Sequence, residues 1–220
     1  MHPDDPAYAG QAEYTPALLA VYDTLVLRLM ARAVWRCPTP PVIERYRRHL
    51  GRRHLDIGPG TGYFLDKAWP PTGLEVTLLD PNPAVLAYAA RRLAPRKVCT
   101  LEADVLKPLP ISGPYDSVAL NYVLHCLPGP QPRKAAAIRH VAAVLAADGV
   151  LFGGTVLGLP AHHTPQARAV LRMFNRQGGF DNLTDDQQGL RDILEASFRT
   201  VEIELVGSVA HFSATDPHPR

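Results

Sequence analysis

The chain has 220 residues and a formal net charge of +2, since 23 lysines and arginines stand against 21 aspartates and glutamates. That near-neutral balance gives no support for a nucleic-acid-binding surface, which normally needs a dense basic face. No stretch approaches the ~20 apolar residues that span a bilayer, and the polar, acidic first residues are not typical of a signal peptide. The three cysteines are widely spaced and odd in number, which indicates neither a disulfide framework nor a CxxC metal site. We therefore expect a soluble, cytoplasmic, single-domain α/β enzyme.

The first pattern along the chain is a set of apolar residues at helical spacing. It predicts a helix over 17–36, started by Thr15-Pro16, and a short second helix over 42–50 after a proline-rich break. The period then changes at His54–Ile57, a short strand that ends in a glycine-rich turn. A helix follows from Tyr63 to Ala68.

Strands and helices alternate through the rest of the chain. Further strands are predicted over 75–79, 97–102, 117–121, 150–156, 200–206 and 208–214, and further helices over 83–93, 132–146, 165–175 and 185–196. Alternation of this kind indicates βαβ units. The fold class predicted is α/β: a doubly wound, mostly parallel seven-stranded sheet with helices on both faces and an N-terminal helical flap.

The strongest motif is an acid at the end of a strand followed by three glycines at alternate positions. These residues are Asp56, Gly58, Gly60 and Gly62. Glycine lets the backbone lie against a ligand where any Cβ would collide. A dinucleotide-binding loop would carry its third glycine at the sixth position, where this chain has Tyr63. No Gly-Lys-Ser/Thr follows either, so a phosphate-binding P-loop is also excluded.

In this register the sequence resembles the class I S-adenosylmethionine-dependent methyltransferases, whose first motif is an acid followed by G-x-G-x-G. Four further family elements match in chain order: an acid ending strand two, an Asp after strand three, a fourth strand that opens onto the cofactor, and a following turn and strand. They are Leu78–Asn82, Glu102–Val105, Tyr115–His125 and Leu145–Leu151. Each match alone is weak, but five in order over about residues 50–156 are highly specific. The resemblance implies a Rossmann-like fold, S-adenosyl-L-methionine as cofactor and S-adenosyl-L-homocysteine as product.

The resemblance also implies roles for individual residues. Asp80 would accept hydrogen bonds from both ribose hydroxyls, and Asp104 from the adenine amino group. The full set of implied cofactor-binding residues is Tyr22, Asp56, Gly58, Gly60, Gly62, Asp80, Pro81, Asn82, Asp104, Val105 and Asn121.

Tyr22 belongs to a second resemblance near the N-terminus. Val21-Tyr22-Asp23 and Val34-Trp35-Arg36 are similar to the "YD…WR" segment of quinone-biosynthesis and small-molecule methyltransferases, in which a leading helical segment folds over the cofactor. The Asn-rich link typical of that segment is missing, which argues against a quinone substrate. We thus expect one domain, with a helical flap over 1–49, a cofactor-binding core over 50–156, and a substrate insertion and closing strands over 157–220.

The acceptor is expected beyond the carboxyl ends of the strands, where open parallel sheets bind their ligands. The predicted substrate-binding residues are Tyr63, Tyr122, His125, His162, His163 and Phe174. His125 is the first candidate for a catalytic base, because it follows strand four directly, although a base is needed only if the acceptor is protonated. The adjacent pair His162-His163 diverges in direction and has no nearby carboxylate or cysteine, so no metal site is predicted.

These features predict a methyltransferase that acts on a small molecule at oxygen, as a monomer or homodimer, without nucleic acid or membrane partners. The alternative is a protein that binds S-adenosylmethionine but catalyses a cyclisation or rearrangement without methyl transfer, which would retain the same motifs. A nicotinamide-dependent dehydrogenase ranks third, because Tyr63 interrupts the dinucleotide fingerprint.

Overall fold

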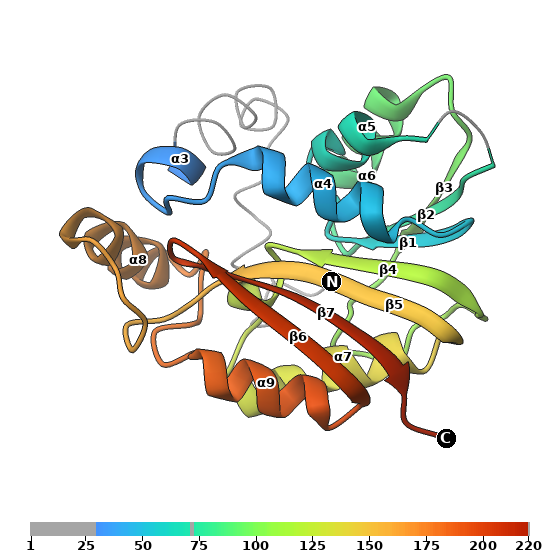
Figure 1. Cartoon of the computed structure of the whole chain (residues 1–220). Helices are drawn as coiled ribbons and strands as arrows, with labels where there is room; N and C mark the ends of the chain where they lie inside the picture. The colour runs from blue at the N-terminus through green and yellow to red at the C-terminus, as the bar shows by residue number, and fades with distance from the viewer. Residues whose placement is uncertain (1–29, 71–72, 220) are drawn as a thin grey trace.

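Seven strands form a single sheet in the order β3-β2-β1-β4-β5-β7-β6 (Figure 1). The computed structural model describes residues 30–70 and 73–219. The strands are β1 (Arg53–Ile57), β2 (Glu75–Asp80), β3 (Val98–Glu102), β4 (Tyr115–Asn121), β5 (Leu145–Val156), β6 (Phe198–Val206) and β7 (Val209–Pro217). Strands β1 to β5 pair in parallel, whereas β7 runs antiparallel to both β5 and β6. The predicted α/β fold with a mostly parallel sheet is therefore confirmed.

Helices cover both faces of this sheet (Figure 1). One face carries α4 (Thr39–His49), α5 (Tyr63–Ala68) and α6 (Pro83–Leu93), and the other carries α7 (Gln131–Ala142) and α9 (Gln187–Glu195). Helix α8 (Pro165–Gln177) lies at one end of the sheet, and two short elements, α3 (Ala31–Ala33) and η2 (Leu124–Cys126), complete the helices of the described residues. Each face thus has its own layer of helices.

Side chains of the strands point alternately to the two faces of the sheet and pack into a separate hydrophobic core on each face. In β4, Val118 and Leu120 pack with α7 and α9, whereas Ala119 between them packs with α4, α5 and α6. This is the period of two expected of a strand buried on both faces. The order of the strands reverses between β1 and β4, and such a switch point opens a crevice at the carboxyl ends of the strands.

Several predicted boundaries are wrong by two residues or more, most of all between α7 and β5. The helix predicted over 132–146 ends at Ala142, and β5 begins at Leu145, so that the Asp148-Gly149 turn lies inside the strand. Leu145 pairs with Tyr115 of β4 across a register shift, and this pairing overrides the helix preference of the alanine-rich run. Helix α4 starts at Thr39 instead of Val42, because prolines in the first turn fit a helix start.

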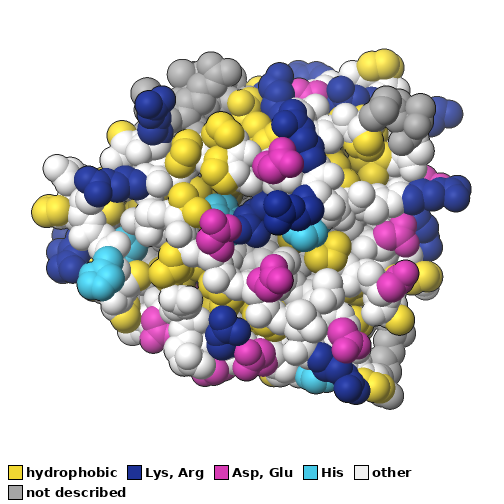
Figure 2. Space-filling view, in the orientation of Figure 1, with side chains coloured by type: hydrophobic (Ala, Val, Ile, Leu, Met, Phe, Trp, Pro, Cys, Tyr) yellow, Lys and Arg dark blue, Asp and Glu magenta, His cyan; other side chains and the backbone are white. Residues whose placement is uncertain are grey.

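The surface over α4 and the outer strands mixes both signs of charge with hydrophobic side chains (Figure 2). Arg45 of α4 forms an ion pair with Glu204 of β6 on this face. No helix within 30–70 and 73–219 is both long and apolar enough to cross a membrane. Most of the predicted flap helix, including Tyr22, lies outside the described residues.

Candidate active site

A cavity opens at the carboxyl ends of β1, β2 and β4, at the switch point of the sheet. Ten residues predicted from the sequence to bind cofactor or acceptor line it. They are Gly58, Gly60, Tyr63, Asp80, Pro81, Asn82, Asp104, Val105, Asn121 and Tyr122. Sequence reasoning missed several of the other lining residues, among them Tyr46, Phe64, Val123, Leu127 and Pro128.

The glycine-rich loop after β1 forms one wall of the cavity. Gly58, Gly60 and Gly62 all have left-handed backbone conformations, with φ of 65°, 55° and 74°. A Cβ added to Gly60 would meet no atom within 4 Å, whereas one added to Gly58 would lie 2.4 Å from Cγ2 of Val123. The loop therefore presents bare backbone to open space at Gly60 and is tightly packed at Gly58.

Two aspartates stand at the ends of the neighbouring strands β2 and β3. Asp80 accepts a hydrogen bond at Oδ1 from the backbone N–H of Asn82 at 2.8 Å. Asp104 accepts one at Oδ1 from the backbone N–H of Leu106 at 2.9 Å. Burial raises the pKa of Asp80 to about 7, against a smaller lowering by the Asn82 N–H. In Asp80 this local backbone contact fixes one carboxylate oxygen and leaves the other available to a ligand. In Asp104 the second oxygen forms an ion pair with Lys107 at 3.8 Å, at the open side of the site.

The end of β4 supplies an amide and an aromatic ring. Asn121 is 6% exposed, and neither polar atom of its side chain has a hydrogen-bond partner among the described residues. Buried amides are normally paired, so this group is poised for a ligand that fills the cavity. Tyr122 follows with a φ of 58°, an unusual conformation for a residue other than glycine, and its ring stacks on Phe64 at a centroid distance of 6.1 Å. Such strained backbone concentrates at functional sites.

The acid of the first motif does not border the cavity. Asp56 is 2% exposed, and the Tyr46 hydroxyl lies 3.2 Å and 3.1 Å from its two carboxylate oxygens. Burial raises the pKa of Asp56 to about 7, while the hydrogen bond from Tyr46 lowers it. One pattern in the sequence could have pointed to Tyr46, because it lies one helical turn after the apolar Val42 in an otherwise arginine-rich segment.

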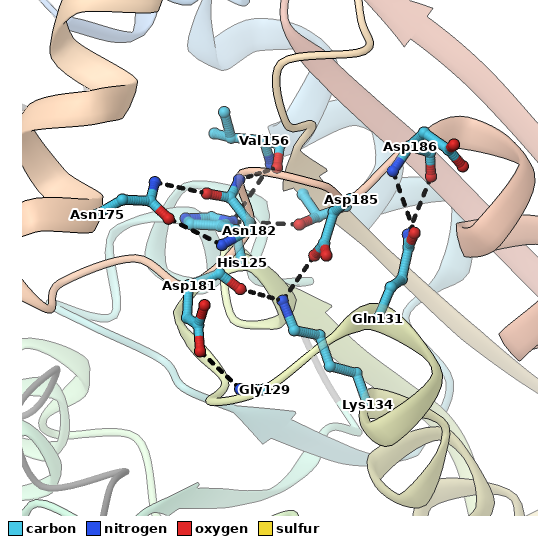
Figure 3. A network of polar contacts seen from close by, with 11 residues as sticks. His125, Gly129, Gln131, Lys134, Val156, Asn175, Asp181, Asn182, Asp185 and Asp186 are labelled. Carbon is cyan, nitrogen blue, oxygen red and sulfur yellow. Dashed lines mark hydrogen bonds and ion pairs between the residues drawn. The ribbon is translucent and has the colours of Figure 1, made fainter.

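His125 lies in η2 and is not among the residues that line the cavity. Figure 3 shows it within a network of polar contacts. Its Nδ1 accepts a hydrogen bond from the backbone N–H of Val156 and lies near Oγ1 of Thr155, both at 3.2 Å. Burial lowers the pKa of His125 to about 3, so the ring is neutral and carries its proton on Nε2. This arrangement favours a structural role for the ring over the predicted role of catalytic base.

The remaining predicted residues lie away from the cavity wall. His163 bonds to Ser208 and to the carbonyl of Gly158 at 2.8 Å and 2.6 Å, and His162 is exposed. Phe174 stacks on Phe180 with ring centroids 4.9 Å apart. The structure therefore does not bring these three predicted residues to the cavity, and Gly62 lies behind it as the N-cap of α5.

The chemistry of the lining fits S-adenosylmethionine. The bare Gly60 backbone admits a close ligand, Asp80 and Asp104 offer carboxylate oxygens to hydroxyl and amino donors, and the unpaired amide of Asn121 suits a polar end group. Together with the strand order, these features define a class I S-adenosylmethionine-dependent methyltransferase.

Comparison with known proteins leads to the same family. The family model "Methyltransferase domain" matches residues 55–151. The chain is 38% identical over 213 residues to demethylluteothin O-methyltransferase of Streptomyces thioluteus, covering 96% of this chain and 93% of the relative. It is also 38% identical over 215 residues to the physcion biosynthesis cluster O-methyltransferase of Aspergillus chevalieri, covering 96% of this chain and 97% of that one. The chain belongs to the S-adenosylmethionine-dependent small-molecule methyltransferases, and its cofactor is S-adenosylmethionine.

A solved structure shares the fold at low sequence identity. The N-methyltransferase NodS of Bradyrhizobium japonicum WM9, in complex with S-adenosyl-L-homocysteine, superposes with a TM-score of 0.61 and 17% identity. The match covers 99% of this chain and 100% of that chain.

Proposed function

We propose that this enzyme transfers the methyl group of S-adenosylmethionine to a hydroxyl oxygen of a small, largely apolar acceptor. The observation that carries the proposal is the lining of the cavity on the α5 and η2 side. That side consists of Tyr63, Phe64, Tyr122, Val123, Cys126, Leu127 and Pro128, none of them charged at neutral pH. Two relatives that align over nearly the whole chain are named O-methyltransferases, which supports oxygen as the atom that is methylated.

In this proposal the cofactor lies across the strand ends. Asp80 accepts from the ribose hydroxyls, Asp104 accepts from the adenine amino group, and the Gly58–Gly60 backbone lies against the ligand. When bound, the cofactor supplies a methyl group already activated on a sulfonium sulfur. The residues of this chain then have to hold the acceptor oxygen in line with that methyl group and exclude water, which can contribute ~7–11 kcal/mol toward the barrier.

The acceptor hydroxyl loses its proton as the new carbon–oxygen bond forms and the carbon–sulfur bond breaks. No His, Lys or Arg lies among the described residues that line the cavity. A phenol or enol that is acidic enough to ionise in water fits this arrangement best, since it needs no base from the protein.

The experiment is an incubation with S-adenosylmethionine carrying a ¹³C-labelled methyl group and a panel of phenols and enols that includes demethylluteothin. We expect S-adenosylhomocysteine and a methylated product in equal amounts, with the carbon chemical shift of a methoxy group. A methyl shift typical of nitrogen or carbon would overturn oxygen as the acceptor atom. Turnover of a substrate without S-adenosylhomocysteine would favour the alternative reaction, a cyclisation or rearrangement, which none of the comparisons supports.

We also propose that the enzyme works in the cytoplasm as a monomer or homodimer and has no nucleic acid partner. The near-neutral charge, and the mixture of both signs of charge on the face in Figure 2, support the absence of a nucleic acid partner. The division into a flap over 1–49, a core over 50–156 and an insertion with closing strands over 157–220 remains part of the same proposal. Light scattering would determine the oligomeric state.

A further inference from the structure

The buried Asp56 carboxyl group and the Tyr46 phenol are hydrogen-bonded to each other at the β1 and β4 end of the cavity. The Tyr46 hydroxyl reaches both oxygens of Asp56, and no other side chain or N–H of the described residues donates to this carboxylate. Tyr46 borders the cavity, whereas Asp56 does not. The phenol therefore lies between the carboxylate and the space that a ligand would fill.

This order of groups gives the phenol oxygen the character of a hydrogen-bond acceptor. A hydroxyl that donates its proton to a carboxylate keeps its lone pairs for another donor, and the anion polarises it and strengthens that second bond. Burial, and after it the charge of Asp56, raise the pKa of Tyr46, so the proton stays on the phenol. Asn121 carries an unpaired carbonyl oxygen and an unpaired amino group. The cluster thus presents a neutral phenol and an amide to the cavity, with a carboxyl group behind them that a cationic ligand would favour in its ionised form.

Such a site suits a group that donates several hydrogen bonds and carries a positive charge. The strand order 3-2-1-4 places Asp80 and Asp104 at the β2 and β3 end of the cavity and the Tyr46 cluster at the β1 and β4 end. If the aspartates hold the ribose and adenine, the amino-acid end of the cofactor lies against Tyr46 and Asn121. No lysine or arginine lines the described cavity to repel its ammonium group.

Resting on the proposed function, we infer that Tyr46 binds the amino-acid end of S-adenosylmethionine. Its hydroxyl oxygen accepts a hydrogen bond from the α-ammonium group while its proton remains on the side of Asp56. Asn121 contacts the same end of the cofactor through its amide.

The test separates the two ends of the cofactor by calorimetric titration. S-Adenosylhomocysteine carries the amino-acid end, and 5′-methylthioadenosine lacks it. The Tyr46→Phe variant keeps the ring contacts to Phe64 and Phe152 but removes the hydroxyl. We expect its affinity for S-adenosylhomocysteine to fall by about ten- to a hundredfold, as for a hydrogen bond to a charged group, and its affinity for 5′-methylthioadenosine to stay unchanged.

Tyr115→Phe is the matched control. The Tyr115 hydroxyl is also hydrogen-bonded, to Thr77 at 3.1 Å, and the residue is buried but does not line the cavity. Its loss should leave both affinities unchanged. Asp56→Asn provides a second variant, and the losses from Tyr46→Phe and Asp56→Asn should fall short of additive in the double variant, because both act through one hydrogen-bonded series.

The possible results separate the inference from the proposed function. Equal loss of affinity for both compounds in Tyr46→Phe, or no loss for either, would overturn the inference while leaving cofactor binding intact. Failure of the unaltered protein to bind S-adenosylhomocysteine would instead contradict the cofactor assignment itself.

Discussion

Two carboxyl groups at the carboxyl edge of the sheet, those of Asp56 and Asp80, have a raised pKa. Asp80 borders the cavity directly, and Asp56 lies behind Tyr46. Burial raises the pKa of each to about 7, so neither is fully ionised at neutral pH before a ligand arrives. The charge that the cofactor meets is therefore set partly by the cofactor's own hydrogen bonds and positive groups.

Asp80→Asn should weaken binding of S-adenosylhomocysteine by about tenfold or more, because a carboxylate hydrogen bond contributes about 1.5–3 kcal/mol. The amide keeps the size of the side chain and one oxygen for the Asn82 N–H, so the circular dichroism spectrum should not change. Isothermal titration calorimetry measures the loss, and Asp148→Asn, at an exposed position in β5, is the control. Unchanged affinity would mean that the ribose does not lie at the end of β2.

Binding should also depend on pH through the same group. Below its pKa of about 7, Asp80 is a neutral acid that has to lose a proton before both oxygens can accept hydrogen bonds. Affinity for S-adenosylhomocysteine should therefore rise between about pH 6 and pH 8, by at most tenfold per unit. Asp80→Asn should flatten this curve, leaving only the contribution of Asp56. A flat profile in the unaltered protein would contradict the expectation.

At the scale of elements, two glycines allow the effect of backbone strain to be distinguished from that of ligand contact. Gly60 lies in the loop after β1, and Gly73 lies before β2. Gly60 and Gly73 both have left-handed φ, of 55° and 81°, and at neither would a Cβ meet an atom within 4 Å. Alanine at either position should cost about 1–2 kcal/mol of folding free energy from the same conformational strain. Only Gly60→Ala should also weaken S-adenosylhomocysteine binding, because only Gly60 lines the cavity. Equal affinity in both variants by calorimetry would show that the ligand does not lie against this loop.

A buried ion pair joins α7 to the segment between α8 and α9 (Figure 3). Lys134 is fully buried, and its Nζ donates to Asp185 at 2.6 Å and to the carbonyl of Asp181 at 2.7 Å. Asp181 in turn donates its backbone N–H to the carbonyl of His125 at 2.8 Å. This network ties the turn beside the cavity to the far helices.

Lys134→Met should destabilise the fold by about 3–5 kcal/mol, because it leaves the Asp185 carboxylate buried without its cation. Urea unfolding monitored by fluorescence measures the change. Arg191→Met is the control, since Arg191 forms an ion pair with Glu195 at 3.2 Å on the surface of α9, where such a pair contributes about 0.3–0.5 kcal/mol. A similar loss of unfolding free energy in the two variants would show that the buried pair contributes no more to stability than the surface pair.

For the whole molecule, cofactor binding and stability are linked. A ligand that binds only the folded state, at about 100 times its Kd, stabilises it by ~2.7 kcal/mol. For a chain of this size the melting temperature should rise by about 5–10 °C with S-adenosylhomocysteine. Gly60→Val, which places a branched side chain in the cavity, should lose most of this rise. A rise with NAD and none with S-adenosylhomocysteine would contradict the family's cofactor and revive a dehydrogenase.

Patterns along the chain were enough to predict the sheet, its helices and ten of the 21 residues that line the cavity. Glycines at alternate positions and acids at strand ends are local features, and the strand order brings them together. The partner of a helix face is not local: nothing in the segment around Tyr46 reveals that it packs over Asp56. A lysine in a helix is expected at the surface, so the burial of Lys134 could not be predicted from the sequence either. The position of His125 was predicted, but not that its Nδ1 is already occupied by a backbone N–H.

The order of the last three strands has a consequence for how the chain acquires its shape during synthesis. Because β7 lies between β5 and β6, the outer edge of β5 has no neighbour until both closing strands have been made. The half of the sheet that carries the cavity can pair earlier, since β1 to β4 need no later strand. A nascent chain that has already formed its cofactor half would thus still display an unpaired strand edge, the kind of surface that chaperones shield and that misassembly exploits.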